Sequence, residues 1–318
     1  MLLNMKRLLP SITIVIALGI LAGLGLNFLL PRFELQLKAN VEYVGNLPDS
    51  SAIQYKDALK APDLAFNLPT TLSVESVNAT SLLALDLKTK RIIVERNSQE
   101  KRSIASITKL LTALVALDYY SINEYVTVTV PPKIIDRNLG LGVGDRIQVR
   151  ELLEAMLVYS SNDSAEILAN ECSCGGYKGF VEEMNEKAKV LGMNSSLFSN
   201  PSGYFDTGNS STAYDLSRLA SAFINSKAFS FVSLKQVDIV FMDNGNTVTK
   251  RLESTNELLG IRTDIKGLKT GYTFASGPSF VSMAQISGRE YVTIILNSED
   301  RFGETSELIS IIQKALIP

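Results

Sequence analysis

The fold is decided by residues 82–118, LLALDLKTKRIIVERNSQEKRSIASITKLLTALVALD. Two short apolar runs, Leu82–Leu87 and Arg91–Glu95, are joined by a polar tripeptide and predict a β-hairpin. A polar turn at 97–103 then leads into an apolar segment from Ser106 to about Asp118. The apolar residues of this segment would cover most of the circumference of a helix, which is typical of a helix inside a large domain. We therefore expect it at the centre of the fold.

The sequence on the C-terminal side of this stretch alternates between strand-like and helix-like patterns. The predicted elements are short strands within 124–150, a helix over 150–170 that breaks near Tyr159–Asn162, a helix over 177–191, a helix over 213–225 opened by Thr212 with Asp215 as an N-cap box, a hairpin of Phe280–Ile286 and Tyr291–Asn297, and a last helix over about Glu304–Leu316. Hairpins at both ends with helices between them predict an α+β architecture, with one antiparallel sheet and helices packed against it.

Composition excludes several classes of function. The chain has 318 residues, enough for one large domain or two smaller ones, and a net charge of −2, which provides no electrostatic reason to expect nucleic acid as a partner. It contains no histidine, so a histidine triad, a histidine-ligated metal or a histidine general base is excluded. Any proton transfer must use Lys, Asp, Glu, Tyr or Cys.

The N-terminus predicts a membrane anchor. Lys6 and Arg7 precede an uncharged, mostly apolar stretch over 8–30, long enough to span a bilayer as a helix. Apolar residues continue beyond the small residues at 19–25, which favours a retained anchor over a cleaved signal peptide. The positive pair predicts that the N-terminus is cytoplasmic and that the rest of the chain lies outside the cytoplasm. The expected organisation is an anchor at 1–30, an extracytoplasmic connector at 31–75 and a catalytic domain at 76–318.

Three short motifs occur in a fixed order. They are Ser106-Ile107-Thr108-Lys109, Ser160-Ser161-Asn162 and Lys269-Thr270-Gly271. In this order, S-x-x-K, S-x-N and K-T-G are found in penicillin-binding proteins and class A β-lactamases. A second S-x-x-K, at Ser98, lies in a polar run where both side chains are expected to be solvated.

The first motif predicts a serine nucleophile with a lysine base. A serine hydroxyl needs a neighbouring base to become reactive, and Lys109 lies one helical turn from Ser106. A lysine acts as a base only when neutral, and burial together with a second cation, Lys269, would lower its pKa. The alternative interpretation is that Lys109 is an exposed helix lysine. For Ser160 and Asn162 the alternative is an ordinary polar turn that breaks a helix.

Longer segments around the motifs extend the resemblance. From about residue 76 to the C-terminus the chain resembles the serine D-alanyl-D-alanine carboxypeptidases, the low-molecular-weight penicillin-binding proteins. The supporting segments include "GVGDRIQVRELLEAMLVYSSNDSAEILA", "FVEEMNEKAKVLGMNSSLFSNPSG", "STAYDLSRLA" and "TNELLGIRTDIKGLKTGYT". The resemblance implies a β-lactamase/transpeptidase-like fold with the site between a helical region and the sheet. The chain departs from the family in Tyr272, where many members have histidine, and in the expected lack of a separate C-terminal β domain and a C-terminal amphipathic anchor.

The resemblance also implies a reaction. Ser106 would attack the penultimate D-Ala carbonyl of a peptidoglycan stem peptide, terminal D-Ala would leave, and water would hydrolyse the acyl-enzyme. β-Lactams would acylate the same serine as inhibitors. No metal or organic cofactor is expected. The implied location is a bacterial cell membrane, with a single span and the catalytic domain outside the cytoplasm.

The implied roles cover nine residues. Ser106, Lys109 and Ser160 would be catalytic, with Ser160 relaying a proton to the leaving amine. Six further residues would bind the substrate. Asn162 would orient Lys109 and the substrate amide, Lys269 and Thr270 would bind the terminal carboxylate, and Arg301 would be a second ligand of that carboxylate. Gly271 would admit an extended substrate, and the backbone N–H of Tyr272 would form an oxyanion hole with that of Ser106. For Arg301 the alternative is a solvated residue that caps the last helix.

Other functions stay open at this stage. On the same fold the chain could be a β-lactamase or a DD-endopeptidase, although residues 192–203 lack the glutamate that a class A β-lactamase needs for deacylation. A non-catalytic, membrane-tethered module that senses the cell wall is a third alternative. For Cys172 and Cys174 we expect two free or buried thiols, with a short-loop disulfide as the alternative.

Overall fold

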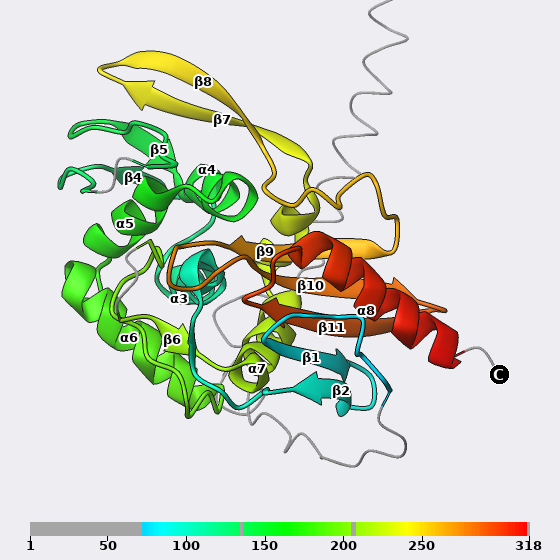
Figure 1. Ribbon diagram of the computed structural model, residues 1–318. Coiled ribbons are helices and arrows are strands. Elements are labelled where there is room, and N and C mark those ends of the chain that lie inside the picture. The colour runs from blue at the N-terminus through cyan, green and yellow to red at the C-terminus, as the bar shows by residue number, and fades with distance from the viewer. Residues whose placement is uncertain (1–71, 134–135, 205–207, 317–318) are drawn as a thin grey trace, which may run out of the picture. The chain divides into compact units, whose positions relative to one another are not determined.

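The computed structural model describes residues 72–133, 136–204 and 208–316. A five-stranded antiparallel sheet runs through this part of the chain in the order β2-β1-β11-β10-β9 (Figure 1). Its strands are β1 (Ser81–Asp86), β2 (Arg91–Arg96), β9 (Ile265–Gly271), β10 (Ser279–Ile286) and β11 (Arg289–Leu296). Both predicted hairpins, β1–β2 and β10–β11, are confirmed. Because β1 pairs with β11, residues from opposite ends of the described chain are adjacent at the middle of the sheet.

The sheet is covered on both faces. Successive side chains of a strand point to opposite faces. Leu83 and Leu85 of β1 therefore join the core formed with the helices of one layer, whereas Leu82 and Ala84 pack with the helix of the other layer. All six residues of β1 are buried as a result, which explains why its four central residues, Leu82–Leu85, are all apolar and do not alternate with polar residues.

One helix, α8 (Arg301–Leu316), covers the face that Leu82 shares (Figure 1). The other helical segments belong to the larger layer. They are the 3₁₀ turn η1 (Ala105–Thr108), α3 (Lys109–Tyr119), α4 (Val149–Glu154), the π-helical turn η2 (Ala155–Tyr159), α5 (Asn162–Asn170), α6 (Gly176–Val190), α7 (Ala213–Ile224) and the 3₁₀ turn η3 (Lys227–Ser233). The predicted helix ends near Tyr159 are confirmed, and α8 begins three residues earlier than expected.

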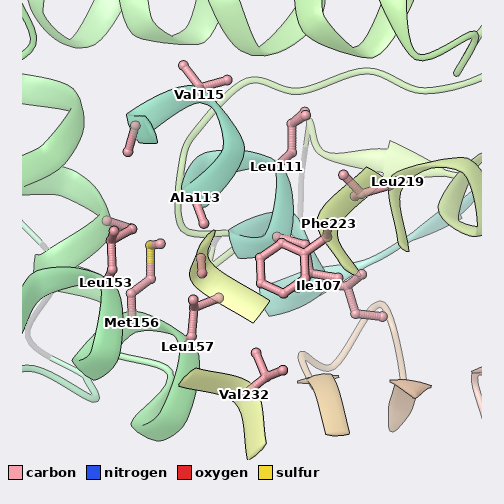
Figure 2. Close-up of a cluster of buried hydrophobic side chains, with 14 of the residues drawn as sticks. Ile107, Leu111, Ala113, Val115, Leu153, Met156, Leu157, Leu219, Phe223 and Val232 are labelled. Atoms are coloured by element: carbon pink, nitrogen blue, oxygen red, sulfur yellow. The ribbon is translucent and has the colours of Figure 1, made fainter. Parts of the chain in front are cut away.

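The helix predicted at the centre of the fold does lie there. In Figure 2, Ile107 and Leu111 face Leu219 and Phe223 of α7 within one cluster of buried side chains. α7 itself begins as predicted, because the side chain of Thr212 accepts a hydrogen bond of 3.0 Å from the backbone N–H of Asp215. The buried helix η1–α3 thereby holds Ser106 and Lys109 between the sheet and the remaining helices.

The expectation of a single sheet is wrong, because the described residues form three. A four-stranded sheet contains β4 (Tyr125–Thr127), β5 (Arg146–Gln148), β7 (Gln236–Asp243) and β8 (Asn246–Glu253), and a two-stranded sheet pairs β3 (Arg102–Ser103) with β6 (Ser210–Ser211). The β7–β8 hairpin is absent from the sequence prediction. Its turn is Asn244-Gly245, with φ of 47° and 83°, and Asn-Gly is a strong signal for such a hairpin.

Cys172 and Cys174 form a disulfide, so the expectation of two free thiols is wrong. Two residues of extended chain would separate the Cα atoms by about 7 Å. Here the chain turns back between α5 and α6, where the Gly176 N–H donates to the Cys172 carbonyl at 2.9 Å, and the two cysteine Cα atoms are 5.2 Å apart. That distance lies within the range that a disulfide bridges.

Within the described ranges, no helix combines the length and apolar character needed to cross a bilayer. The predicted span at 8–30 and most of the predicted connector lie outside the described residues.

Candidate active site

The nucleophile and its base come from one turn of the chain. Ser106 lies in η1 and Lys109 is the first residue of α3, and the Lys109 Nζ lies 2.9 Å from the Ser106 Oγ. Lys109 is fully buried, which excludes the alternative of an exposed helix lysine. The S-x-x-K at Ser98 has no such partner: Ser98 is buried rather than solvated, and its hydroxyl donates to the carboxylate of Glu95.

Two further oxygen atoms surround the Lys109 amine. Its Nζ donates to the side-chain carbonyl of Asn162 at 2.7 Å and to the backbone carbonyl of Ser202 at 2.6 Å. Both atoms can only accept hydrogen bonds. A neutral amine has two N–H groups for these two acceptors, and its lone pair is then free to accept the Ser106 O–H. This arrangement suits a lysine that takes a proton from serine.

Burial favours the neutral form of this lysine. Removal from water lowers the pKa of Lys109 well below its ordinary value, and the positive charges of Lys269 and Arg137 lower it further. Lys269, the second cation expected from the sequence, therefore does lower the pKa of Lys109. Arg137, which was not expected from the sequence, adds to this effect.

The S-x-N segment faces this lysine from the break between α4 and α5. The π-helical turn η2 ends at Ser160, which adopts a left-handed conformation with φ of 72°. The side chain of Ser161 caps α5 by accepting the backbone N–H of Ser164. This break turns Ser160 toward the cavity and brings Asn162 against Lys109.

The K-T-G segment comes from β9, an edge strand of the five-stranded sheet. Lys269 is buried, and its surroundings lower its pKa to about 7, first through burial and then through the charges of Arg137 and Arg301. The Thr270 and Thr255 Oγ1 atoms are 2.6 Å apart. The Arg301 Nη1 donates to the Gly271 carbonyl at 3.0 Å, so its guanidinium lies at the end of β9 although Arg301 also begins α8.

Two glycines allow the close packing of these segments. A Cβ at Gly203 would lie 1.9 Å from the Ala105 carbonyl oxygen, and a Cβ at Gly271 would lie 2.9 Å from that of Ile104. Gly203 also has a φ of +69°, which strains any other residue. Gly271 was expected to admit substrate; in the structure its lack of a side chain also lets β9 approach the nucleophile turn.

These segments enclose an open cavity of about 610 Å³. It is lined by Ser106, Asp136, Arg137, Ser160, Asn162, Gly203, Tyr204, Thr255, Thr270, Gly271, Tyr272, Thr273, Phe274 and Arg301. Seven of the nine predicted site residues therefore line one cavity, and the other two, Lys109 and Lys269, are buried next to residues that line it. Within the described ranges, no group of three or more His, Cys, Asp or Glu side chains could hold a metal ion.

Several residues of the site, some lining the cavity and one beside Lys109, are not among the predicted ones. Asp136 and Arg137 lie in no recognisable motif, and only their contacts with Asn162 bring them to the site. Ser202 and Gly203 lie in the "NPSG" segment that carried part of the resemblance, but no role was assigned to them. Thr255 belongs to an additional S-x-N triplet, Ser254-Thr255-Asn256. Nothing in the surrounding sequence distinguishes this triplet from the others of the same form.

Comparisons with known proteins agree with this geometry. The D-alanyl-D-alanine carboxypeptidase family model matches residues 68–300. The Escherichia coli D-alanyl-D-alanine carboxypeptidase DacD is 30% identical over 256 residues, covering 76% of this chain and 64% of DacD, so the chain spans just under two thirds of that relative. The E. coli D-alanyl-D-alanine endopeptidase is 32% identical over 239 residues, covering 74% of this chain and 75% of the relative.

Solved structures with the same fold include a DD-transpeptidase and a penicillin-binding protein. A mutant of the Streptomyces K15 DD-transpeptidase is similar with a TM-score of 0.69 and 25% identity, covering 78% of this chain and all of that one. Penicillin-binding protein D2 from Listeria monocytogenes, in its ampicillin-bound form, has a TM-score of 0.65 and 30% identity, covering 74% and 98%. The fold is thus α+β and transpeptidase-like. With its three motifs gathered around one cavity and a family match over most of its length, the chain belongs to the D-alanyl-D-alanine carboxypeptidase family.

Proposed function

We propose that this protein is a serine D-alanyl-D-alanine carboxypeptidase that removes terminal D-Ala from peptidoglycan stem peptides and is acylated by β-lactams. One observation carries the proposal. The Ser106 Oγ lies 2.9 Å from a buried lysine amine, on a cavity that also presents Thr270 and Arg301. A hydroxyl, an adjacent buried amine and a cationic carboxylate site are the groups that such a reaction requires.

Acylation begins with proton transfer from Ser106 to Lys109. The Ser106 Oγ attacks the penultimate D-Ala carbonyl while the Lys109 Nζ takes its proton, and the carbonyl becomes an oxyanion. The backbone N–H groups of Ser106 and Tyr272 stabilise that oxyanion. As the C–N bond breaks, the proton passes from Lys109 by way of Ser160 to the leaving amine. Lys109 is then neutral again and can deprotonate the water that hydrolyses the acyl-enzyme.

The terminal carboxylate of the substrate binds at the end of β9. Lys269 contributes positive charge from beneath the cavity, the Thr270 hydroxyl donates a hydrogen bond, and Arg301 provides a guanidinium next to the Gly271 carbonyl. A carboxylate bound there favours the protonated form of Lys269, because an opposite charge nearby raises the pKa of an amine.

The decisive test uses the full-length chain. Purified protein is incubated with a pentapeptide ending in D-Ala-D-Ala, and released D-Ala is measured. The same protein is labelled with a fluorescent penicillin and the labelled peptide is mapped. We expect D-Ala release and a label on Ser106, and neither in Ser106→Ala. Covalent labelling of Ser106→Ala would refute the assignment of the nucleophile, and labelling without D-Ala release would favour a non-catalytic penicillin-binding sensor.

A second candidate is a DD-endopeptidase, favoured by the 32% identity to the E. coli D-alanyl-D-alanine endopeptidase. It would use the same acylation chemistry on a cross-linked peptide, whose leaving amine belongs to a second peptide chain. Cleavage of purified cross-linked dimers faster than cleavage of the pentapeptide would establish it. A class A β-lactamase is not favoured, since Asp136 is the sole acidic residue among the described residues that line the cavity.

The proposal includes a location. Residues 8–30 anchor the protein as a single span in a bacterial cell membrane. Residues 31–75 connect this anchor to a catalytic domain at 76–318, which lies outside the cytoplasm, where peptidoglycan is found. The uncharged stretch after Lys6 and Arg7 supports this arrangement. Release of a shortened chain by mild washing of membranes would contradict it.

A further inference from the structure

Arg137 is a cation on the cavity to which the proposed reaction assigns no role. Its exposed side chain lines the cavity together with Ser106 and Arg301. Its guanidinium lies over the Tyr159 ring, 5.6 Å from the ring centroid, and it forms no ion pair with any described residue. The charge of Arg137 therefore faces the space where the substrate would lie.

The backbone holds Arg137 in a fixed relation to the active-site residues. The Arg137 carbonyl accepts the backbone N–H of Asn162 at 2.8 Å, and the Asp136 carbonyl accepts the Asn162 Nδ2 at 2.9 Å. Arg137 also has a φ of +44°, an unfavourable conformation for a side-chain-bearing residue. Such strain persists where surrounding contacts impose it, and it clusters at sites that clamp ligands.

The charges around the cavity are unbalanced in favour of cations. Burial lowers the pKa of Lys109, Lys269 and Arg301, and the positive charge of Arg137 lowers each of them further. Within the part of the chain that the structure describes, Asp136 is the sole acidic residue of the lining. One terminal carboxylate, bound by Lys269 and Arg301, leaves Arg137 without an ion-pair partner among the described residues. A guanidinium binds a carboxylate through two parallel hydrogen bonds, which makes it selective for that group.

We propose that Arg137 is a specificity-determining residue that binds a second carboxylate of the peptide substrate, separate from the C-terminal one. This inference rests on the proposed function. The second carboxylate belongs either to the acyl-donating peptide or to the leaving group, and the two sources share the same chemistry at Arg137.

The test compares matched peptides that differ by one carboxylate. In one pair, glutamine or glutamate directly precedes the acyl D-Ala; in the other, the leaving residue is D-glutamine or D-glutamate. For each pair the ratio of kcat/KM, acidic over neutral, is measured with the full-length protein. We expect a ratio of about ten in one pair, which identifies the source of the carboxylate, because a charge-assisted hydrogen bond at a partly solvated site contributes about a tenfold preference.

Variants assign that preference to the guanidinium. Arg137→Gln should bring the ratio to within about twofold of one, and Arg137→Lys should give an intermediate value, because lysine keeps the charge but loses the paired geometry. Lys178→Gln removes an exposed cation of α6 outside the cavity and should leave the ratio unchanged. Thermal unfolding of each variant checks that it is folded.

The inference is overturned by ratios near one in both pairs for the wild type, or by a ratio that survives Arg137→Gln. Equal losses with acidic and neutral peptides would overturn it too, since they would show that Arg137 acts on Lys109 or Lys269 and does not select the substrate. Failure of the proposed function looks different, because then the neutral peptides are not cleaved either.

Discussion

The backbone carbonyl of Ser202 lies 2.6 Å from the Nζ of Lys109, although 93 positions separate the two residues in the chain. This carbonyl takes one of the two N–H groups of a neutral lysine and so orients the lone pair toward Ser106. Gly203, the next residue, passes so close to the Ala105 carbonyl that no side chain fits. The base is therefore positioned by a loop that contributes no side chain to it.

Gly203→Ala should disrupt both stability and activity. The added Cβ meets the Ala105 carbonyl oxygen at 1.9 Å, so the loop must move and withdraw the Ser202 carbonyl from Lys109. We expect a loss of about 3 kcal/mol in the free energy of unfolding and at least about tenfold slower acylation by penicillin. Gly288→Ala is the matched control: its φ is similar, +76°, but nothing lies within 4 Å of the new Cβ, so it should cost about 1 kcal/mol and leave acylation unchanged.

Lys109→Arg should abolish base catalysis, because it replaces a lysine that can be neutral with a side chain that is always charged. Arginine is not deprotonated in proteins, so it cannot accept the Ser106 proton. We expect acylation to slow by about 10²–10⁴-fold, the usual contribution of a general base. Stopped-flow acylation with a chromogenic cephalosporin measures the rate. Lys101→Arg, the exposed lysine of the other S-x-x-K, serves as the control and should stay within about twofold of wild type. A rate for Lys109→Arg within that same range would exclude Lys109 as the base.

The pH dependence of kcat/KM should be bell-shaped. Lys109 must be neutral, so the rate rises with pH as this lysine, whose pKa is far below the usual value, loses its proton. Lys269 must be protonated to bind a carboxylate, and its pKa in the free enzyme is about 7, so the rate falls above that pH. A substrate with a C-terminal amide should lack the alkaline limb. Profiles of kcat/KM for both substrates test this, and an unchanged alkaline limb with the amide would contradict the role of Lys269.

Thr255→Val should weaken substrate binding more than turnover. Valine has nearly the same shape but loses the hydroxyl that lies 2.6 Å from that of Thr270 and orients it. We expect KM to rise about fivefold, the effect of about 1 kcal/mol, with little change in kcat. Thr293→Val removes an equally short hydroxyl pair, with Ser282, inside the sheet and away from the cavity. It should lower the unfolding temperature without changing KM; equal effects of both variants on KM would contradict the role of Thr255.

Cys172 and Cys174 should resist alkylation until they are reduced. The disulfide consumes both thiols of the chain. Mass spectrometry of protein denatured in excess iodoacetamide should find no added carbamidomethyl group without reductant and two after reduction. Two additions in the unreduced sample would show that the bridge is absent.

Local sequence determines which segments form and where they end. The Asp86–Arg91 turn, the Thr212 cap of α7 and the helical spacing of Ser106 and Lys109 depend on residues close together in the chain, and each is recognisable there. The β7–β8 hairpin was recognisable as well, from Asn244-Gly245, because an Asn-Gly turn acts locally.

Tertiary structure alone decides the state of Lys109 and the remaining contacts of the site. Whether a lysine is charged depends on how much water surrounds it and which cations lie near, and here those are Lys269 and Arg137, remote in sequence. The Ser202 carbonyl and the Arg137 side chain reach the cavity only through packing between loops. Backbone carbonyls are the same in every residue, so no sequence pattern distinguishes the one that holds a catalytic amine.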